Sequence, residues 1–510
     1  MPFKTGFQLA AIKQLAGQTI WYGASNIGAK FLNYLLTPLI TYLLSSSEGM
    51  KDYGDFSLLY VWIAVANVVF TYGFETGYFR FSNKEDVNID RLFQTTFGSI
   101  LITTPILLLV LTVFQKSINN FIGLEGHSNY IVWCALLIAF DAISAIPFAK
   151  LRQENRPKKY AFVKLSGILV NIFFTAFFLI YLPSHVKANP DSIFASWVND
   201  NTAVGMLIMA NLLQNLFVFA MLFHEWKGFK FSFDFPLWKK VFNYSSPMIV
   251  IGLAGMINEV LDRQMLAKFL PIPPDDAKRI VGIYSANYKL AILITLFISA
   301  FKMAAEPFFF SKAKEKNAVQ LYARVMKWFV ITMCLAFLFT TMYLDILKYF
   351  IGESYRSGMG IVPILLAANI CLGIYYNLSV WYKLTDKMSM GLYIAVFGAV
   401  VTLIGNYIFI PYWGMYAAAW VTFSCYFLMM ITTYVIGQKY YPVPYNIKKL
   451  TAYLISMLLL FAAETGLRGI TESVIIRLIG GTVFLGLFLL LILKVEKNEL
   501  KTMPIIGKWI

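Results

Sequence analysis

The feature that most constrains this chain is a succession of fourteen apolar stretches, separated by short polar connections. A helix of about 20 apolar residues is long enough to cross the hydrocarbon core of a bilayer. Because 59% of the 510 residues are hydrophobic and only 14% are charged, a soluble fold would expose far too much apolar surface. The sequence therefore predicts an all-α polytopic membrane protein with about 14 transmembrane helices. The predicted spans are 18–44, 55–78, 92–115, 128–149, 159–182, 202–224, 241–264, 280–304, 321–344, 357–378, 388–410, 413–437, 449–466 and 473–494.

Positive charges are distributed unevenly between the two sets of connections. Of the 43 lysines and arginines, 29 lie in the termini and in the connections on the same side, and 9 lie in the opposite connections. Because cytoplasmic segments of membrane proteins are enriched in lysine and arginine, we predict that both termini are cytoplasmic. The net charge of +16 is then a topology signal, and we expect no nucleic-acid partner because no folded basic domain is present.

A weak internal repeat divides the first twelve spans into two halves. Residues 54–85 can be aligned with residues 282–315, which places Gly54 on Gly282 and also matches a serine, a tyrosine and a glutamate. Since both segments run from the outer to the inner side, the repeat is parallel and predicts two pseudo-symmetric six-helix lobes. The predicted segments are an interfacial start, the first lobe, a cytoplasmic linker, the second lobe, two further helices and a cytoplasmic tail. Their boundaries are 1–17, 18–224, 225–240, 241–437, 438–494 and 495–510.

Residues suited to catalysis or metal binding are scarce. All four cysteines lie inside predicted spans, and the three histidines form no cluster with the spacing of a metal site. No arrangement of serine, cysteine and histidine indicates a nucleophile, and the phosphate-binding pattern GxxxxGK[ST] is absent from the sequence. We therefore predict that the chain is not an enzyme and needs no cofactor. Any energy input would come from an ion gradient, from the substrate concentration or from a partner.

The first predicted span contains polar residues at helical spacing. Asn26, Lys30 and Asn33 recur at steps of three and four residues, with Lys30 near mid-depth. Asparagines at such positions either line a polar cavity or form hydrogen bonds between helices. A charge at membrane depth costs about 2.5–3.5 kcal/mol on insertion, so Lys30 indicates a transport pathway.

The seventh and eighth spans carry the densest group of charges. Glu259 and Arg263 are four residues apart and can pair on one helix face, Asp262 lies on the neighbouring face, and Lys289 follows in the next span. The predicted topology places these residues in the outer half of the membrane. Together with Lys30 near the middle, they suit a water-filled cavity that receives an anion such as a diphosphate. The alternative is that Asp262 and Arg263 cap a helix at the outer interface.

Four sequence segments resemble a known superfamily of transporters. They are DRQML at 262–266, GIYSANYKL at 282–290, FIGESYRSG at 350–358 and NYIFIPYWGMYAAAWVTFS at 406–424. In combination they are similar to the multidrug/oligosaccharidyl-lipid/polysaccharide (MOP) exporter superfamily, and specifically to its polysaccharide transporters of the Wzx flippase type. The resemblance covers essentially the whole chain.

The resemblance implies a flippase that moves a polyprenyl-diphosphate-linked oligosaccharide across the bacterial inner membrane. In such proteins two lobes surround a cationic cavity that opens alternately to each side, while the polyprenyl tail stays in the lipid. The two C-terminal helices are similar to those of the related lipid II flippase, where they help form a groove for the tail. The alternatives are a cation-coupled multidrug exporter of the same superfamily, which normally stops at twelve helices, and a membrane-embedded glycan enzyme.

The resemblance also implies roles for individual residues. It favours Lys30, Arg263 and Lys289 as contacts for the diphosphate, with Glu259 and Asp262 orienting these cations. The acids best placed to couple transport to a proton or sodium gradient are Glu75, Asp141 and Glu306. These acids can equally pair with the adjacent basic loops. The implied partners are the lipid-linked oligosaccharide, membrane lipids, and a glycan polymerase with its chain-length machinery, in the synthesis of O-antigen or another surface polysaccharide.

Overall fold

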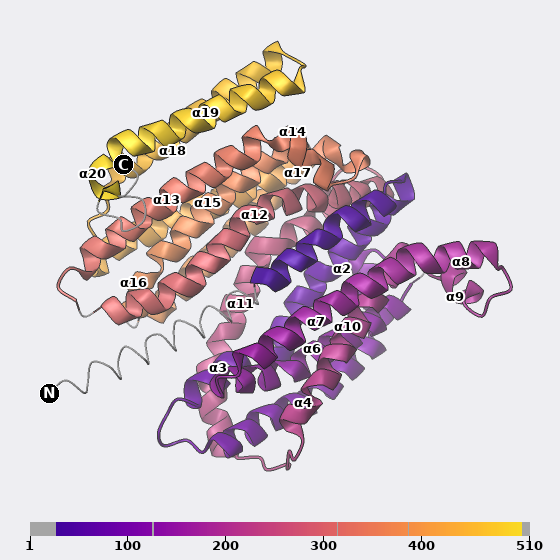
Figure 1. Ribbon diagram of the computed structural model, residues 1–510. Coiled ribbons are helices and arrows are strands. Elements are labelled where there is room, and N and C mark those ends of the chain that lie inside the picture. The colour runs from indigo at the N-terminus through magenta and orange to yellow at the C-terminus, as the bar shows by residue number, and fades with distance from the viewer. Residues whose placement is uncertain (1–26, 125–126, 314, 386, 502–510) are drawn as a thin grey trace. The chain divides into compact units, whose positions relative to one another are not determined.

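The computed structural model describes residues 27–124, 127–313, 315–385 and 387–501. All regular secondary structure in these ranges is helical (Figure 1), which confirms the predicted all-α membrane fold. The predicted cavity residue Asn26 lies outside the described residues. After a helical segment at 27–43, the first half contains α2 (Ser47–Thr71), α3 (Phe74–Phe81), α4 (Ile89–Val113), α5 (Gln115–Ile122), α6 (Asn129–Gln153), α7 (Pro157–Ala176), η1 (Phe177–Tyr181), α8 (Leu182–Ala188), α9 (Ala195–Asp200) and α10 (Ala203–Trp226). The second half contains α11 (Phe235–Phe269), α12 (Pro274–Lys312), α13 (Ala318–Met342), α14 (Leu344–Leu347), η2 (Lys348–Phe350), η3 (Glu353–Ile361), α15 (Val362–Leu378), α16 (Val380–Leu384), α17 (Met388–Tyr440), α18 (Ile447–Ile470), α19 (Val474–Val495) and α20 (Lys497–Leu500).

Among the described residues, eleven helices are long and apolar enough to cross a membrane. A twelfth span is formed if the two parts of α12, Pro274–Ile292 and Ile294–Phe310, are counted as one bent helix. The predicted number of fourteen stays a prediction. Part of the difference has a plain cause, because α17 alone covers two of the predicted spans, 388–410 and 413–437.

The two predicted spans within α17 meet at a break in the helix. Gly414 has φ 54° and ψ −131°, a conformation outside the helical region that residues with a side chain rarely adopt. Pro411 lies three residues earlier and cannot donate a backbone hydrogen bond to the preceding turn. These two residues interrupt the helix between its apolar halves, as a turn between two membrane spans requires.

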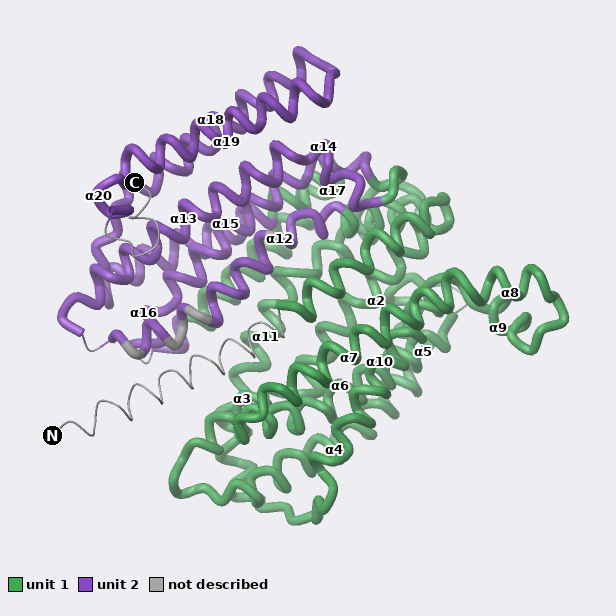
Figure 2. Tube along the Cα trace, in the orientation of Figure 1, with its two compact units in different colours: residues 1–286, 352–355, 391–421 green, residues 287–351, 356–390, 422–510 purple. Residues whose placement is uncertain are grey.

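The chain divides into two compact units, shown in different colours in Figure 2. The first unit contains residues 1–286, 352–355 and 391–421, and in it α6 packs against α4, α7 and α10, while α2 packs against α11. The second unit contains residues 287–351, 356–390 and 422–510, and in it α13 packs against α15, α18 and α19. The predicted lobe boundaries stay a prediction.

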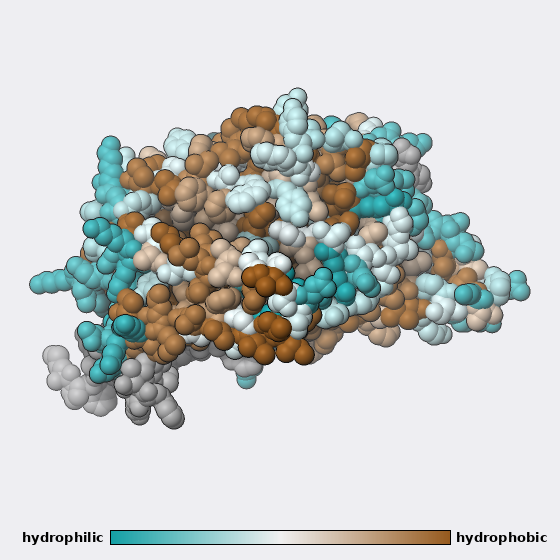
Figure 3. Space-filling model, turned by 90° about the horizontal axis from the view of Figure 1, so that it is seen from above, coloured by the Kyte–Doolittle hydropathy of each residue, from teal (hydrophilic) through white to brown (hydrophobic). Residues whose placement is uncertain are grey.

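Large apolar side chains are exposed along many of these helices. Leu109, Phe173 and Leu459 expose 63%, 62% and 66% of their surface, respectively. In the view of Figure 3, hydrophobic residues cover broad areas of the visible face. Such surfaces are expected for helices that are solvated by lipid rather than water.

The C-terminal hairpin of α18 and α19 is attached to the second unit at the end that the charge distribution assigns to the outer side. Asp345, in α14, is buried and forms ion pairs with Arg468 at 3.2 Å and Arg477 at 3.7 Å. Arg468 also donates a hydrogen bond to the Thr341 carbonyl oxygen at 3.2 Å. One carboxylate thus holds both arms of the hairpin beside the end of α13.

A second group of charges attaches the same hairpin at the predicted inner end. Glu496 is 3% exposed and accepts hydrogen bonds from Lys327 and Tyr453, both at 2.6 Å. Glu499 accepts a hydrogen bond from Lys327 as well. Burial alone would raise the pKa of Glu499, but hydrogen bonds, first among them that from Lys327, outweigh burial and lower the pKa to about 2. We call these residues the C-terminal clamp.

Replacing Lys327 by methionine is expected to destabilise the protein by about 2 kcal/mol, because the substitution removes a cation that two carboxylates share. Glu496 keeps Lys449 at 2.8 Å and Glu499 keeps Arg324 at 2.6 Å, so neither carboxylate is left without a cation. The lowered pKa of Glu499 means that its stabilising contribution is complete above its ordinary value of 4.5 and is lost as pH falls toward about 2. The apparent melting temperature in detergent at pH 7 should therefore be lower for Lys327→Met than for wild type. The matched control is Lys316→Met, at an exposed position. Equal melting temperatures for Lys327→Met and wild type would contradict the clamp.

Candidate functional site

The two glycines that align in the internal repeat contact each other's helices. Gly54 in α2 and Gly282 in α12 are both buried, and a Cβ at Gly54 would overlap the carbonyl oxygen of Lys278. A Cβ at Gly282 would likewise overlap the carbonyl oxygen of Met50. Each glycine therefore faces the residue four positions before the other glycine, which is the pattern that a two-fold axis between equivalent helices produces. We call this crossing the glycine seam; only residues without a side chain let two helices approach so closely.

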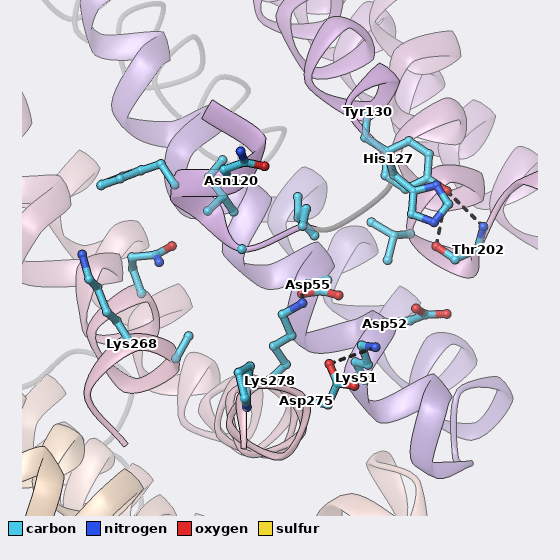
Figure 4. Close-up of a pocket in the computed structure, with 18 of the residues that line it drawn as sticks. Lys51, Asp52, Asp55, Asn120, His127, Tyr130, Thr202, Lys268, Asp275 and Lys278 are labelled. Atoms are coloured by element: carbon cyan, nitrogen blue, oxygen red, sulfur yellow. Dashed lines mark hydrogen bonds and ion pairs between the residues drawn. The ribbon is translucent and has the colours of Figure 1, made fainter. Parts of the chain in front are cut away.

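Ion pairs flank the glycine seam and join the same two helices (Figure 4). Lys278 Nζ lies 3.2 Å from Asp55 Oδ1, and the two side chains are only 11% and 8% exposed. A buried pair of this kind is costly to break, by about 3–5 kcal/mol when one partner is removed. Two further ion pairs lie nearby. They are more exposed than the Lys278–Asp55 pair and therefore contribute less to stability. The three pairs between α2 and α12 are Lys51–Asp275, Asp55–Lys278 and Glu48–Arg279.

The charged residues of the seventh predicted span lie close together in α11. Asp262 is 2% exposed and accepts a hydrogen bond from the Tyr284 hydroxyl at 2.6 Å. Arg263 pairs with the Asp262 carboxylate at 3.2 Å and also donates a hydrogen bond to the backbone carbonyl oxygen of Glu259, at 3.1 Å. The Glu259 side chain is exposed, whereas Asp262 is buried beside the guanidinium. The predicted roles of Glu259 and Asp262 in orienting the cations stay predictions.

Four other predicted site residues lie on helices other than α11. Lys30 and Asn33 are exposed and lie three residues apart on the helical segment 27–43, which places them on the same side of that helix. Lys289 is half-buried in α12 and belongs to the second unit. Glu306 also lies in α12, and its side chain is outside the described part of the structure. The predicted roles of Lys30, Asn33 and Lys289 in the cavity, and of Glu306 in ion coupling, stay predictions.

The two remaining acids have hydrogen-bonding partners within the first unit. Glu75 in α3 forms an ion pair with Arg152 near the end of α6. Asp141 in the middle of α6 accepts a hydrogen bond from the Asn67 amide of α2. Pairing of Glu75 with a basic residue matches the alternative in which inner acids pair with nearby cations. Coupling roles for Glu75 and Asp141 stay predictions.

Sequence reasoning missed several buried carboxylates, among them Asp55 and Glu225. Asp55 directly follows the repeat glycine in an apolar helix, and this position was a usable signal. Glu225 is 4% exposed and accepts a hydrogen bond from Arg156 at 2.6 Å and another from Lys159. Glu225 lies in the last turn of α10, in a stretch that the sequence assigns to a basic connection, and its sequence neighbours give no indication of burial.

These features define a multi-pass membrane protein in which equivalent helices of a parallel repeat meet at one end, and its fold is that of the MOP exporters. The lipid II flippase MurJ in an inward closed conformation superposes with a TM-score of 0.68 at 13% identity, covering 93% of this chain and 99% of that one. The multidrug transporter DinF-BH, in complex with R6G, gives a TM-score of 0.57 at 14% identity, covering 84% and 96%. These similarities confirm the predicted superfamily fold.

The chain belongs to the family of polysaccharide biosynthesis proteins, whose sequence profile matches residues 15–314. A relative encoded at the Lsg locus of Haemophilus influenzae is 22% identical over 417 residues, covering 78% of this chain and 93% of that protein. The chain is thus a polysaccharide-type member of the MOP superfamily, as its sequence motifs predicted.

Proposed function

We propose that this chain is a flippase that moves a polyprenyl-diphosphate-linked oligosaccharide from the inner to the outer leaflet of the bacterial inner membrane. Its termini face the cytoplasm in this proposal, and its product serves synthesis of O-antigen or another surface polysaccharide. The polysaccharide biosynthesis family and the fold shared with a lipid II flippase support this substrate class. The observation that carries the mechanism is the glycine seam with its ion pairs, because it is a closure built from equivalent parts of the repeat.

In this proposal the glycine seam closes the outer end while the substrate headgroup enters from the inner side. Separation of α2 and α12 would then break the Lys278–Asp55 pair and open the path outward. Alternating access needs such an element with two discrete arrangements. The crossing of α2 and α12 can serve as this element, because its backbone contact is present in the closed arrangement and absent in the open one.

The diphosphate needs cationic partners once it leaves water, because a desolvated anion without them is very costly. We propose that Arg263 and Lys30 provide two of these partners, with Lys289 as a third. Asp262 holds the Arg263 guanidinium in place while Tyr284 fixes Asp262. An arginine oriented in this way can meet a phosphate with two parallel hydrogen bonds, which gives specificity as well as attraction.

Purified protein in vesicles is expected to move a fluorescent lipid-linked oligosaccharide between leaflets, faster with a proton or sodium gradient than without one. We propose this coupling because no ATP-binding motif is present in the sequence and because Glu75, Asp141 and Glu306 are well placed to carry an ion. The measurement is the fraction of substrate accessible to a membrane-impermeant quencher over time, with protein-free vesicles as the control. Equal rates with and without any gradient would contradict coupling. Transport of a dye such as R6G without movement of the oligosaccharide would favour the alternative of a multidrug exporter.

A further inference from the structure

A cavity of about 730 Å³ lies in the first unit beside the glycine seam (Figure 4). Its walls come from the neighbouring ends of α2, α10 and α12, from the end of α11, and from the connection between α5 and α6. The charge distribution assigns these helix ends to the outer side. The volume lies within the range of about 300–1,000 Å³ that is usual for sites that bind small molecules. It is large enough for several rings rather than for a single ion.

Aromatic side chains form rigid parts of the cavity wall. The His127 and Tyr130 rings are stacked, with centroids 4.8 Å apart and planes at 5°. The Tyr130 hydroxyl accepts a hydrogen bond from the Thr202 backbone N–H at 3.0 Å, which fixes this stack. Phe121 is 56% exposed and packs edge to face on Trp62, with centroids 5.3 Å apart. Tyr130 is itself 1% exposed and supports the half-buried His127 ring on which it stacks. Phe121 is the exposed ring of these three, and Lys268 Nζ lies 5.5 Å from its centroid. An aromatic ring beside a polar group can contact a ligand that has both apolar and polar faces.

The polar lining of the cavity favours hydroxyl groups over phosphate, metal or acyl chains. Four carboxylates and three lysines line it, and three of the carboxylates are paired with cations, so the cavity offers a diphosphate no excess of positive charge. The described residues contain no group of three or more histidines, cysteines, aspartates or glutamates that could hold a metal ion. Carboxylates and amides accept hydrogen bonds from hydroxyl groups, and lysines donate to them. These side chains include Asp52 and Lys268, which Figure 4 shows on different sides of the cavity, and Asn120.

We propose that this cavity binds sugar residues of the glycan on the outer side, as a site separate from the cations that would hold the diphosphate. The proposal deepens the proposed flippase function and rests on it for the identity of the sugar donor. The Phe121 and His127 rings would contact sugar faces, while Asp52, Asn120 and Lys268 would form hydrogen bonds with the sugar hydroxyl groups. Because the cavity adjoins the glycine seam, an emerging glycan would meet it as α2 and α12 separate.

The test measures sugar binding by the full-length protein in nanodiscs, without any transport step. The probe is the oligosaccharide repeat unit released by mild acid from the host's polyprenyl diphosphate, and binding is followed by saturation-transfer NMR. Phe121→Ala and Asp52→Asn are each expected to weaken binding at least tenfold. Asp52→Asn keeps a side-chain acceptor for the Ala203 backbone N–H, so the helix end that it caps is preserved. The matched controls are Phe194→Ala and Asp191→Asn, exposed positions in a connection on the same predicted side, and both should bind as wild type does.

Absence of sugar binding by the wild type, or equal binding by all four variants, would overturn the cavity proposal. Inorganic diphosphate is the second probe, and its binding should be unchanged in Phe121→Ala and Asp52→Asn. Loss of diphosphate binding in these two variants would overturn the assignment of this cavity to sugars. Translocation in vesicles without sugar binding would overturn this proposal alone. Sugar binding without translocation would overturn the proposed flippase function and support the cavity site.

Discussion

Replacing Gly54 by alanine is expected to reduce glycan export at least tenfold in a deletion strain that depends on the variant. The added methyl group would overlap the backbone carbonyl oxygen of Lys278, and a backbone carbonyl has no rotamer into which it can withdraw. Overpacking of this kind costs about 1–3 kcal/mol, so the closed seam would become up to about a hundredfold less populated. The measurement is surface polysaccharide per cell, normalised to the amount of protein in the membrane.

Gly255→Ala is the matched control for this substitution. A Cβ at Gly255, in the interior of α11, would have no atom within 4 Å, so the methyl group has room. Alanine is favoured over glycine inside a helix by about 0.5–1 kcal/mol, and export should remain at the wild-type level. Gly282→Ala, the equivalent change on the other side of the seam, should behave like Gly54→Ala. Normal export by both seam variants would show that closure of α2 against α12 is not required.

Replacing Arg263 by alanine is expected to cause a large loss of both stability and export. The Asp262 side chain is only 3% exposed, and removal of its cation would leave a buried carboxylate at a cost of about 3–5 kcal/mol. A double variant, Asp262→Asn with Arg263→Met, separates the two effects. The asparagine oxygen can still accept the hydrogen bond from Tyr284, so stability should return. Export should not return, because the proposed diphosphate contact is still missing.

Two measurements decide this prediction: the melting temperature in detergent, and the amount of unflipped lipid-linked oligosaccharide that accumulates in the deletion strain. Lys30→Ala serves as the comparison, because Lys30 is exposed and its loss should reduce export with little change in melting temperature. Full export by the double variant would assign Arg263 to helix packing alone. Full export by Lys30→Ala would remove Lys30 from the substrate path while leaving the flippase proposal in place.

The helical class and the approximate positions of the spans could be predicted because a helix that crosses a bilayer needs a long apolar stretch. Such a stretch is visible in the local sequence. Helix breaks were harder to predict. The interruption of α17 depends on Gly414 and Pro411, and residues of the same types occur inside uninterrupted helices, such as Pro105 in α4. The difference depends on how each residue packs, which hydropathy does not record.

The candidate site was predicted in part. Alignment of Gly54 with Gly282 indicated a repeat, but it did not predict that the two helices contact each other at these glycines. Helical spacing indicates that Glu259 can reach Arg263, whereas the contact of Arg263 with the adjacent Asp262 carboxylate depends on burial, which spacing does not record. Asp55 and Lys278 are distant in sequence, and no local pattern indicates that they pair.

The hairpin of α18 and α19 is held to α13 at both of its ends, by Asp345 at one end and by the C-terminal clamp at the other. Because ion pairs attach the hairpin at two distant points, we expect α13, α18 and α19 to move together. A lipid chain that lies along α18 or α19 would then be displaced together with α13. In a transport cycle, such a lipid chain would stay in contact with the same helices while only the headgroup changes its surroundings.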